Sequence, residues 1–198
     1  DGFGNAALWL STAQPHDQLV VRSSSRVALR ARFNGLRPGA SPPWDGLAAG
    51  LRYVAGGRCD AAVAFVQPSP YVPRLPELQA WARPSFASGR PVAEAALELM
   101  HRLHGEFEYR SDSTAVDTPL ATAFAQRAGV CQDFAHLLAG ALRMLGLPVR
   151  YVSGYLLTQP PGGGADLVGA DASHAWVQVY APGTPGVPGG WLDLDPTN

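Results

Sequence analysis

Lysine is absent from this chain of 198 residues, in which all 15 basic residues are arginine. The protein therefore has no lysine side chain whose amine could accept an acyl group. The 15 basic residues are balanced by 16 acidic ones, and the formal net charge is −1. This balance gives no electrostatic basis for binding nucleic acid or an anionic membrane surface, and we expect neither as a partner.

Cysteine is scarce, and long apolar runs are lacking. Cys59 and Cys131 are the only two cysteines, too few for a disulfide framework, so we expect free thiols and a cytoplasmic protein. No apolar run reaches the roughly 20 residues that a membrane-spanning helix needs. With 46% hydrophobic and 16% charged residues, the chain can still bury a core, as one large or two small domains.

Cys131 begins a segment with the pattern of a half-buried helix. Apolar residues recur three and four positions apart from Phe134 to Leu145, and Cys131 lies on the same stripe, after Gly129. Free backbone amides and the positive end of the helix dipole favour a thiolate at this position. His136 is turned by about 140° from Cys131, so a catalytic base has to come from elsewhere in the chain.

His174 and two aspartates lie on a predicted pair of strands. From His174 to Ala181, apolar and polar residues alternate as in a strand with one buried face. After a Pro/Gly loop, a second strand at 191–195 carries Asp193 and Asp195 on one face. Because paired strands lie about 5 Å apart, a carboxylate can reach His174, and an imidazole held by a carboxylate can activate a thiol. Asp195 is a physically reasonable partner, although the register stays open.

These segments resemble the transglutaminase-like superfamily, whose bacterial members include candidate cysteine proteases. The matching stretches cover nearly the whole chain and lie at 70–73, 106–109, 127–136, 147–156, 172–177 and 191–198. The resemblance implies that Cys131 is the nucleophile, His174 the general base and then acid, and Asp195 the residue that orients the imidazole. Two positions depart from the family pattern: Gln178 stands where an acidic residue is common, and Asp193 where glycine is common.

The resemblance implies an α+β fold of the papain-like, transglutaminase-core type, with the cysteine helix packed on an antiparallel sheet. Helices followed by paired strands agree with this class. We expect residues 1–33 to be the last strands of a β-rich N-terminal domain, 34–76 a linker or extended crossing, and 77–198 the catalytic core. The remainder of the N-terminal domain, or further sheet after Asn198, would then be missing from this chain.

Local patterns predict several further elements. Strand-like runs lie at 6–10 and 18–33, and a further strand is expected at 150–157. A helix is expected at 92–103. A second, short helix should follow a cap at 117–119 and extend to about residue 126. A glycine-rich loop is expected at 158–172, directly before His174. Its glycines predict a mobile segment that admits water to the neighbouring cleft.

The implied chemistry is acyl transfer from a peptide or glutamine-type amide of a protein or peptide substrate to Cys131, which forms a thioester. Water would complete hydrolysis, and an amine would complete transfer. We favour a cysteine peptidase or amidase; a transglutaminase is the first alternative, although nothing resembles a calcium-binding loop. An inactive interaction module is the second, because some relatives keep the fold and lose the cysteine.

Tyr109 is a candidate donor to the oxyanion, beside the backbone amide of Cys131. Asp133 and His136 are expected to support the structure. His101 and His104 lie three residues apart on a predicted helix, but no third ligand is evident, so we expect a solvated helix face. The sequence predicts no metal and no cofactor.

Overall fold

The computed structural model describes residues 3–22, 24, 26–28, 30–156 and 173–198. The chain divides into two compact units, Asp1–Arg30 and Ala31–Asn198. The glycine-rich loop expected at 158–172 lies outside the described residues.

The first unit contains neither helix nor strand in the residues that the structure describes. The prediction of strands at 6–10 and 18–33 is therefore wrong for the described part of these segments. A strand needs a neighbour to satisfy its backbone groups, and large apolar side chains such as Leu8 and Trp9 are 84% and 93% exposed. Alternating apolar residues without a covering layer do not form a sheet. The assignment of 1–33 to a β-rich domain stays a prediction.

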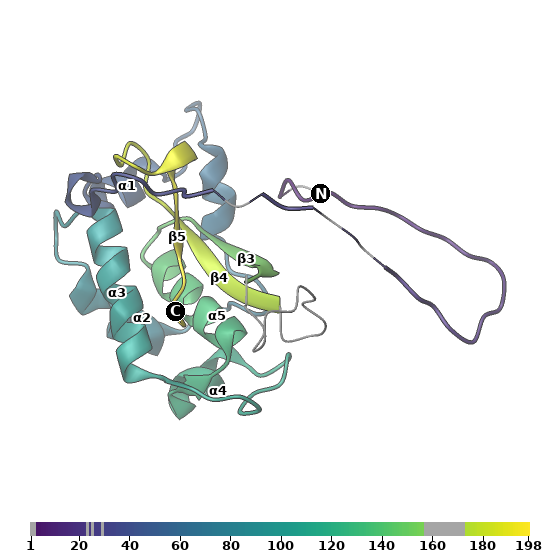
Figure 1. The fold of residues 1–198 in the computed structure, drawn as a ribbon. Helices are drawn as coiled ribbons and strands as arrows, with labels where there is room; N and C mark the ends of the chain where they lie inside the picture. The colour runs from purple at the N-terminus through teal and green to yellow at the C-terminus, as the bar shows by residue number, and fades with distance from the viewer. Residues whose placement is uncertain (1–2, 23, 25, 29, 157–172) are drawn as a thin grey trace. The chain divides into compact units, whose positions relative to one another are not determined.

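The second unit is built from helices around one small sheet. Its helices are α1 (Trp44–Gly50), α2 (Pro76–Ala82), α3 (Val92–Glu106), α4 (Leu120–Gln126) and α5 (Cys131–Met144). Its strands are β1 (Glu108–Tyr109), β2 (Ala128–Gly129), β3 (Val149–Tyr155), β4 (Ser173–Tyr180) and β5 (Trp191–Leu194). In Figure 1, α5 lies at the centre, and it contacts β3 and β4 as well as α2, α3 and α4. This arrangement confirms the α+β class and the cysteine helix packed on a sheet.

The sheet has the order β3-β4-β5, and both pairs are antiparallel. Val177 of β4 lies opposite Leu194, and His174 lies opposite Gly154 of β3. The predicted pairing of the histidine strand with the aspartate strand is thereby confirmed. The pairing brings the N-terminal end of β4 to the C-terminal end of β5.

The sequence of α5 explains both its stability and its length. From Cys131 to Met144 it contains no β-branched residue and is rich in Ala and Leu, which favour helix. It ends in a Schellman motif: Gly146 has φ +84°, its amide donates to Arg143, and the Leu147 amide donates to Leu142. Because a left-handed residue is needed at this point, glycine at 146 stops the helix.

The buried face of α5 forms the centre of the core. Phe134, Leu138 and Leu142 are at most 1% exposed and belong to the same cluster as Val177 and Val179 of β4. These valines come from the apolar face that the alternation of β4 predicts.

Three smaller predictions have mixed outcomes. The helix expected at 92–103 is α3, which continues to Glu106, and the strand expected at 150–157 is β3, which begins at Val149 and ends at Tyr155. The cap expected at 117–119 is not made by a side chain. Helix α4 begins after Pro119, and the Thr118 hydroxyl instead accepts a hydrogen bond from the Ala115 amide at 2.8 Å.

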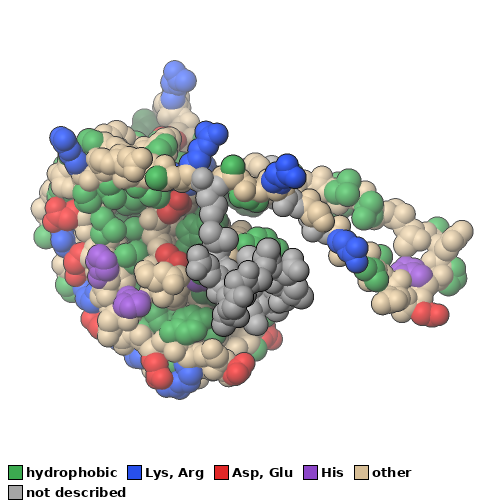
Figure 2. Space-filling view, in the orientation of Figure 1, with side chains coloured by type: hydrophobic (Ala, Val, Ile, Leu, Met, Phe, Trp, Pro, Cys, Tyr) green, Lys and Arg blue, Asp and Glu red, His purple; other side chains and the backbone are tan. Residues whose placement is uncertain are grey.

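Charge and hydrophobicity at the surface follow the composition. Figure 2 shows acidic and basic side chains interspersed around the second unit, without a large field of one sign on this face.

Among the helices that the structure describes, none combines the length and the apolar character needed to span a bilayer. The cytoplasmic location stays a prediction.

Candidate active site

Cys131 is the first residue of α5 and is half-buried. The backbone before it is held by Asp133, a carboxylate that is 3% exposed. Its Oδ2 accepts hydrogen bonds from the Val130 amide at 2.9 Å and from the Thr114 hydroxyl at 2.5 Å. An acidic side chain in the first turn also interacts favourably with the helix dipole. Asp133 therefore fixes the turn that presents the thiol.

Gly129 makes this turn possible. A Cβ atom at position 129 would lie 2.6 Å from the Cβ of Asp133 and 2.7 Å from its Oδ2, closer than non-bonded atoms can approach. The structure shows that the close approach that requires glycine is made by the side chain of Asp133.

Tyr109 is brought to the cysteine by a short parallel bridge between β1 and β2. Tyr109 is paired with Gly129, two residues before Cys131, and the Arg110 amide donates to the Gly129 carbonyl at 2.9 Å. Burial raises the pKa of the Tyr109 hydroxyl, and the negative charge of a Cys131 thiolate raises it further. The hydroxyl therefore keeps its proton at neutral pH and can act as a hydrogen-bond donor.

His174 lies at the start of β4, is 8% exposed, and contacts Asp195 just beyond the end of β5. The distance between His174 Nε2 and Asp195 Oδ2 is 2.7 Å. Asp195 also accepts hydrogen bonds from the Thr197 amide at 3.0 Å, the Thr197 hydroxyl at 2.8 Å and the Asn198 amide group at 2.8 Å. Burial alone would raise the pKa of Asp195, but these bonds, with Asn198 first, and the bond to His174 lower it overall. Asp195 is thus held as a carboxylate.

Asp193 is directed to other partners. It accepts a hydrogen bond from Gln178 at 2.6 Å across the β4–β5 pair, and it forms an ion pair with Arg32 at 2.9 Å. The carboxylate in contact with His174 is that of Asp195. The two positions that depart from the family pattern, Gln178 and Asp193, are therefore bonded to each other.

Cys131 and His174 line one pocket of about 270 Å³. Its lining residues are Tyr109, Cys131, Leu156, Ser173, His174, Thr197 and Asn198. The bond from His174 Nε2 to Asp195 leaves Nδ1 as the ring nitrogen available for proton exchange with the thiol. The pocket therefore presents a thiol, an imidazole and a hydroxyl donor to one small space, which is an arrangement suited to reaction at a carbonyl group.

Thr197 and Asn198 are two site residues to which the sequence alone gives no role. Both donate to Asp195 and line the pocket with Cys131. A signal was present in the sequence, because an aspartate commonly accepts a hydrogen bond from the backbone two residues on, and Thr197 occupies that position.

Two other candidate groups lie elsewhere. The His136 ring stands between two tyrosines, with ring centroids 5.9 Å from Tyr71 and 5.0 Å from Tyr151, and it does not line the Cys131 pocket. His104 Nδ1 is 2.9 Å from the Pro196 carbonyl oxygen. Within the described ranges, no group of three or more His, Cys, Asp or Glu side chains is placed to hold a metal.

The region that carries these groups also matches a family profile. The profile described as the transglutaminase-like superfamily matches residues 79–196. This chain belongs to the transglutaminase-like superfamily. Cys131, His174 and Asp195 of this transglutaminase-like chain all fall within the matched region.

Several relatives are known. A protein of Mycobacterium tuberculosis is 38% identical over 200 residues, which cover all of this transglutaminase-like chain and 62% of the relative. The chain thus spans less than two thirds of that protein. A protein-glutamine gamma-glutamyltransferase of Pseudomonas aeruginosa is 34% identical over 114 residues, which are 56% of this chain and 16% of that protein. A candidate cysteine protease from Cytophaga hutchinsonii has a similar solved structure, with a TM-score of 0.57 and 30% identity over 75% of this chain and 46% of that one.

Gly129→Ala tests the helix start. We expect the variant to lose about 1–3 kcal/mol of stability, because the new methyl group displaces Asp133 and its capping bonds. Gly105→Ala is the matched control: a Cβ there meets nothing within 4 Å, and alanine is the better helix former. Urea unfolding of both variants measures the difference. Equal stabilities would contradict the role given to Gly129.

Proposed function

We propose that this protein is a thiol-dependent acyl-transfer enzyme that acts on peptide or glutamine-type amides, most readily as a cysteine peptidase or amidase. The observation that carries the proposal is the 2.7 Å contact between His174 and Asp195 at a pocket that Cys131 also lines. A half-buried thiol at a helix start, a buried imidazole and a carboxylate held by three other donated hydrogen bonds are the parts that such chemistry needs.

In the proposed mechanism, the sulfur of Cys131 attacks the amide carbonyl carbon after its proton has moved to His174. The C–N bond then breaks, His174 returns the proton to the leaving amine, and an acyl thioester remains on Cys131. Asp195 keeps the ring in one orientation and stabilises its cation. The imidazole therefore acts first as a base and then as an acid.

The negative charge that develops on the carbonyl oxygen needs donors. Tyr109 has a protonated hydroxyl in the same pocket, and the backbone amide of Cys131 lies at a helix start, where no carbonyl of the helix accepts from it. We assign the oxyanion to these two donors. The parallel bridge between β1 and β2 holds Tyr109 in place for this role.

Hydrolysis is the favoured outcome for the thioester. Ser173, Thr197 and Asn198 contribute polar side chains to the pocket, and such a lining is compatible with a water molecule that attacks the thioester. The solved relative that covers 75% of this chain is a candidate cysteine protease. Transfer to an amine is the second candidate, favoured by the Pseudomonas aeruginosa relative that is named a protein-glutamine gamma-glutamyltransferase.

Thiol labelling distinguishes an enzyme from an inactive module. Cys59 is exposed and Cys131 is half-buried, so access alone predicts that Cys59 reacts faster. We expect iodoacetamide to label Cys131 first near neutral pH, because His174 activates it. Mass spectrometry of the labelled peptides gives both rates.

The Cys131→Ser variant should lose turnover without unfolding. Turnover retained by this variant would contradict the assignment of Cys131 as the nucleophile.

Asp195→Asn is expected to lower turnover by about 10³ to 10⁴, because the imidazole loses its orienting partner and its stabilised cation. Asp193→Gly is the matched comparison, since Asp193 bonds to Gln178 and Arg32. We expect this change to be mild. The measurement is kcat/KM on any amide that the parent cleaves, and a reversal of the two effects would identify Asp193 as the orienting residue.

A partition experiment decides between hydrolysis and transfer. Given a peptide or glutamine-type amide, the protein should release mainly the free acid, because water has access to the thioester. A millimolar primary amine should divert only a minor share into a new amide. Mass spectrometry separates the two products, and predominant incorporation of the amine would establish the transferase instead.

A further inference from the structure

Two cavities adjoin along α5, and Cys131 lines neither of them; together they are called the groove. The first, of about 340 Å³, includes Gln132, the residue next to Cys131. The second, of about 580 Å³, extends to Gly146 beyond the C-terminal end of the helix. The two share Val72 and Arg143 as lining residues. The groove therefore runs from the neighbour of the thiol along the whole length of α5.

The end of the groove near Cys131 is walled by aromatic rings. The rings of Tyr71 and His136 stack with an interplanar angle of 13°, and Tyr151 lies on the other side of His136. Burial lowers the pKa of His136, so its ring is neutral at neutral pH. No acidic residue lines this cavity. The chemistry of these walls fits an apolar or aromatic side chain.

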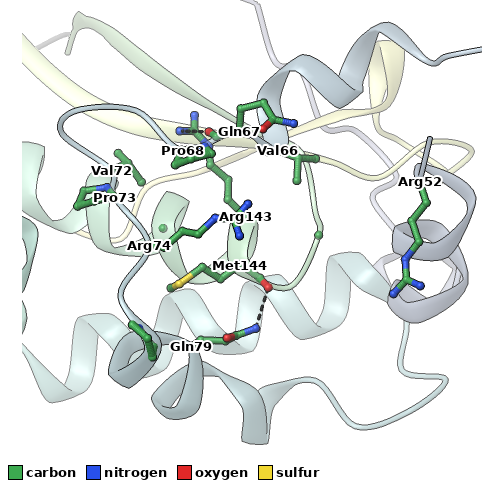
Figure 3. Close-up of a pocket in the computed structure, with 13 residues that line it drawn as sticks. Arg52, Val66, Gln67, Pro68, Val72, Pro73, Arg74, Gln79, Arg143 and Met144 are labelled. Carbon is green, nitrogen blue, oxygen red and sulfur yellow. Dashed lines mark hydrogen bonds between the residues drawn. The ribbon is translucent and has the colours of Figure 1, made fainter.

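The far end of the groove is positively charged. Arg52, Arg74 and Arg143 line it, without an acidic lining residue. Figure 3 shows Arg74 extending across the cavity towards α5, while Arg52 stands at the other side of the view. Among the described residues, none of the three guanidinium groups lies within ion-pair distance of a carboxylate.

Arg143 is the most enclosed of these three cations. Its guanidinium donates to the carbonyl oxygens of Val149, at 2.7 Å, and Gln67, at 3.3 Å. Carbonyl groups satisfy the N–H donors but do not neutralise the charge. Burial accordingly lowers the pKa of Arg143, although the group stays protonated. A concave surface with uncompensated cations attracts an anionic ligand.

We infer that this groove binds the acyl side of an acidic peptide, with an apolar side chain near Cys131 and a carboxylate at Arg52 and Arg74. The inference rests on the proposed function for the direction of the peptide. His174 must protonate the leaving amine, and it lines the other pocket. The leaving amine therefore lies at His174, and the acyl part of the peptide lies in the groove.

The length of the helix sets the spacing within the peptide. The 14 residues of α5 span about 20 Å, and an extended peptide covers this length with about six residues. The acidic residues should accordingly stand about five or six positions before the scissile amide.

Binding of two fluorescent peptides to the Cys131→Ser variant tests the groove without turnover. One is a six-residue peptide amide with two glutamates at its N-terminal end and phenylalanine next to the C-terminal amide; its twin has glutamines in place of the glutamates. By fluorescence anisotropy, the acidic peptide should bind about tenfold more tightly at low salt, and the difference should shrink as salt is raised.

Substitutions locate the charge effect. Arg52→Gln and Arg74→Gln should each weaken binding of the acidic peptide about threefold to fivefold and leave the glutamine twin unchanged. Arg83→Gln is the matched control, because Arg83 is exposed, packs over Trp44 and does not line the groove. Arg143 is kept, since its hydrogen bonds hold the backbone.

Equal binding of the two peptides, no measurable binding of either, or an equal loss in Arg83→Gln would overturn the inference. None of these results bears on whether Cys131 is catalytic, which labelling and turnover decide. Conversely, the protein could prove inactive and still prefer the acidic peptide through Arg52 and Arg74. The groove would then stand as an acidic-peptide site, and only the proposed reaction would be refuted.

Discussion

The burial of α5 against the sheet is the constraint on which the candidate site depends. Leu138 and Leu142 on the helix and Val177 on β4 are fully enclosed, and cutting back one such leucine typically costs about 2–5 kcal/mol. The whole stability of a domain is only about 5–15 kcal/mol, so this interface cannot loosen without unfolding the unit. Cys131 lies at one end of the helix and His174 at one end of the strand. Their approach is therefore set by apolar packing, and not by any attraction between thiol and imidazole.

Polar contacts then adjust the two ends of this rigid interface. At the helix start, Asp133 holds the turn through the Val130 amide, and Gly129 leaves room for it. At the sheet, Asp195 receives its bonds from Thr197 and Asn198, within three residues along the chain. Such local bonds order the side chains at a small cost in conformational entropy, because the backbone that carries them is already fixed. The site thus combines long-range packing with short-range hydrogen bonding.

This division explains how much of the site could be predicted. The period of α5 and the alternation of β4 depend on neighbouring residues alone, and both were readable in the sequence, as was the order of Cys131, His174 and Asp195. The ion-pair partner of Asp193 was not readable, because Arg32 is 161 positions away and only the folded chain brings it near. The strands expected at 6–10 and 18–33 failed for a related reason. A suitable pattern forms a strand only where another strand or a covering layer exists, and local sequence does not report either.

The pair of residues that depart from the family pattern illustrates a compensation across the sheet. Gln178 and Asp193 lie directly opposite each other in the β4–β5 register. An acidic residue at 178 would place two negative charges side by side, which is unfavourable for cross-strand neighbours, whereas the Gln178 amide donates to Asp193. Arg32 neutralises the same carboxylate from outside the sheet. With both partners in place, Asp193 has no need of His174 as a counterion. The imidazole of His174 is therefore free to bond to Asp195. Gln178 and Asp193, which both depart from the family pattern, thus act together to preserve the contact between His174 and Asp195.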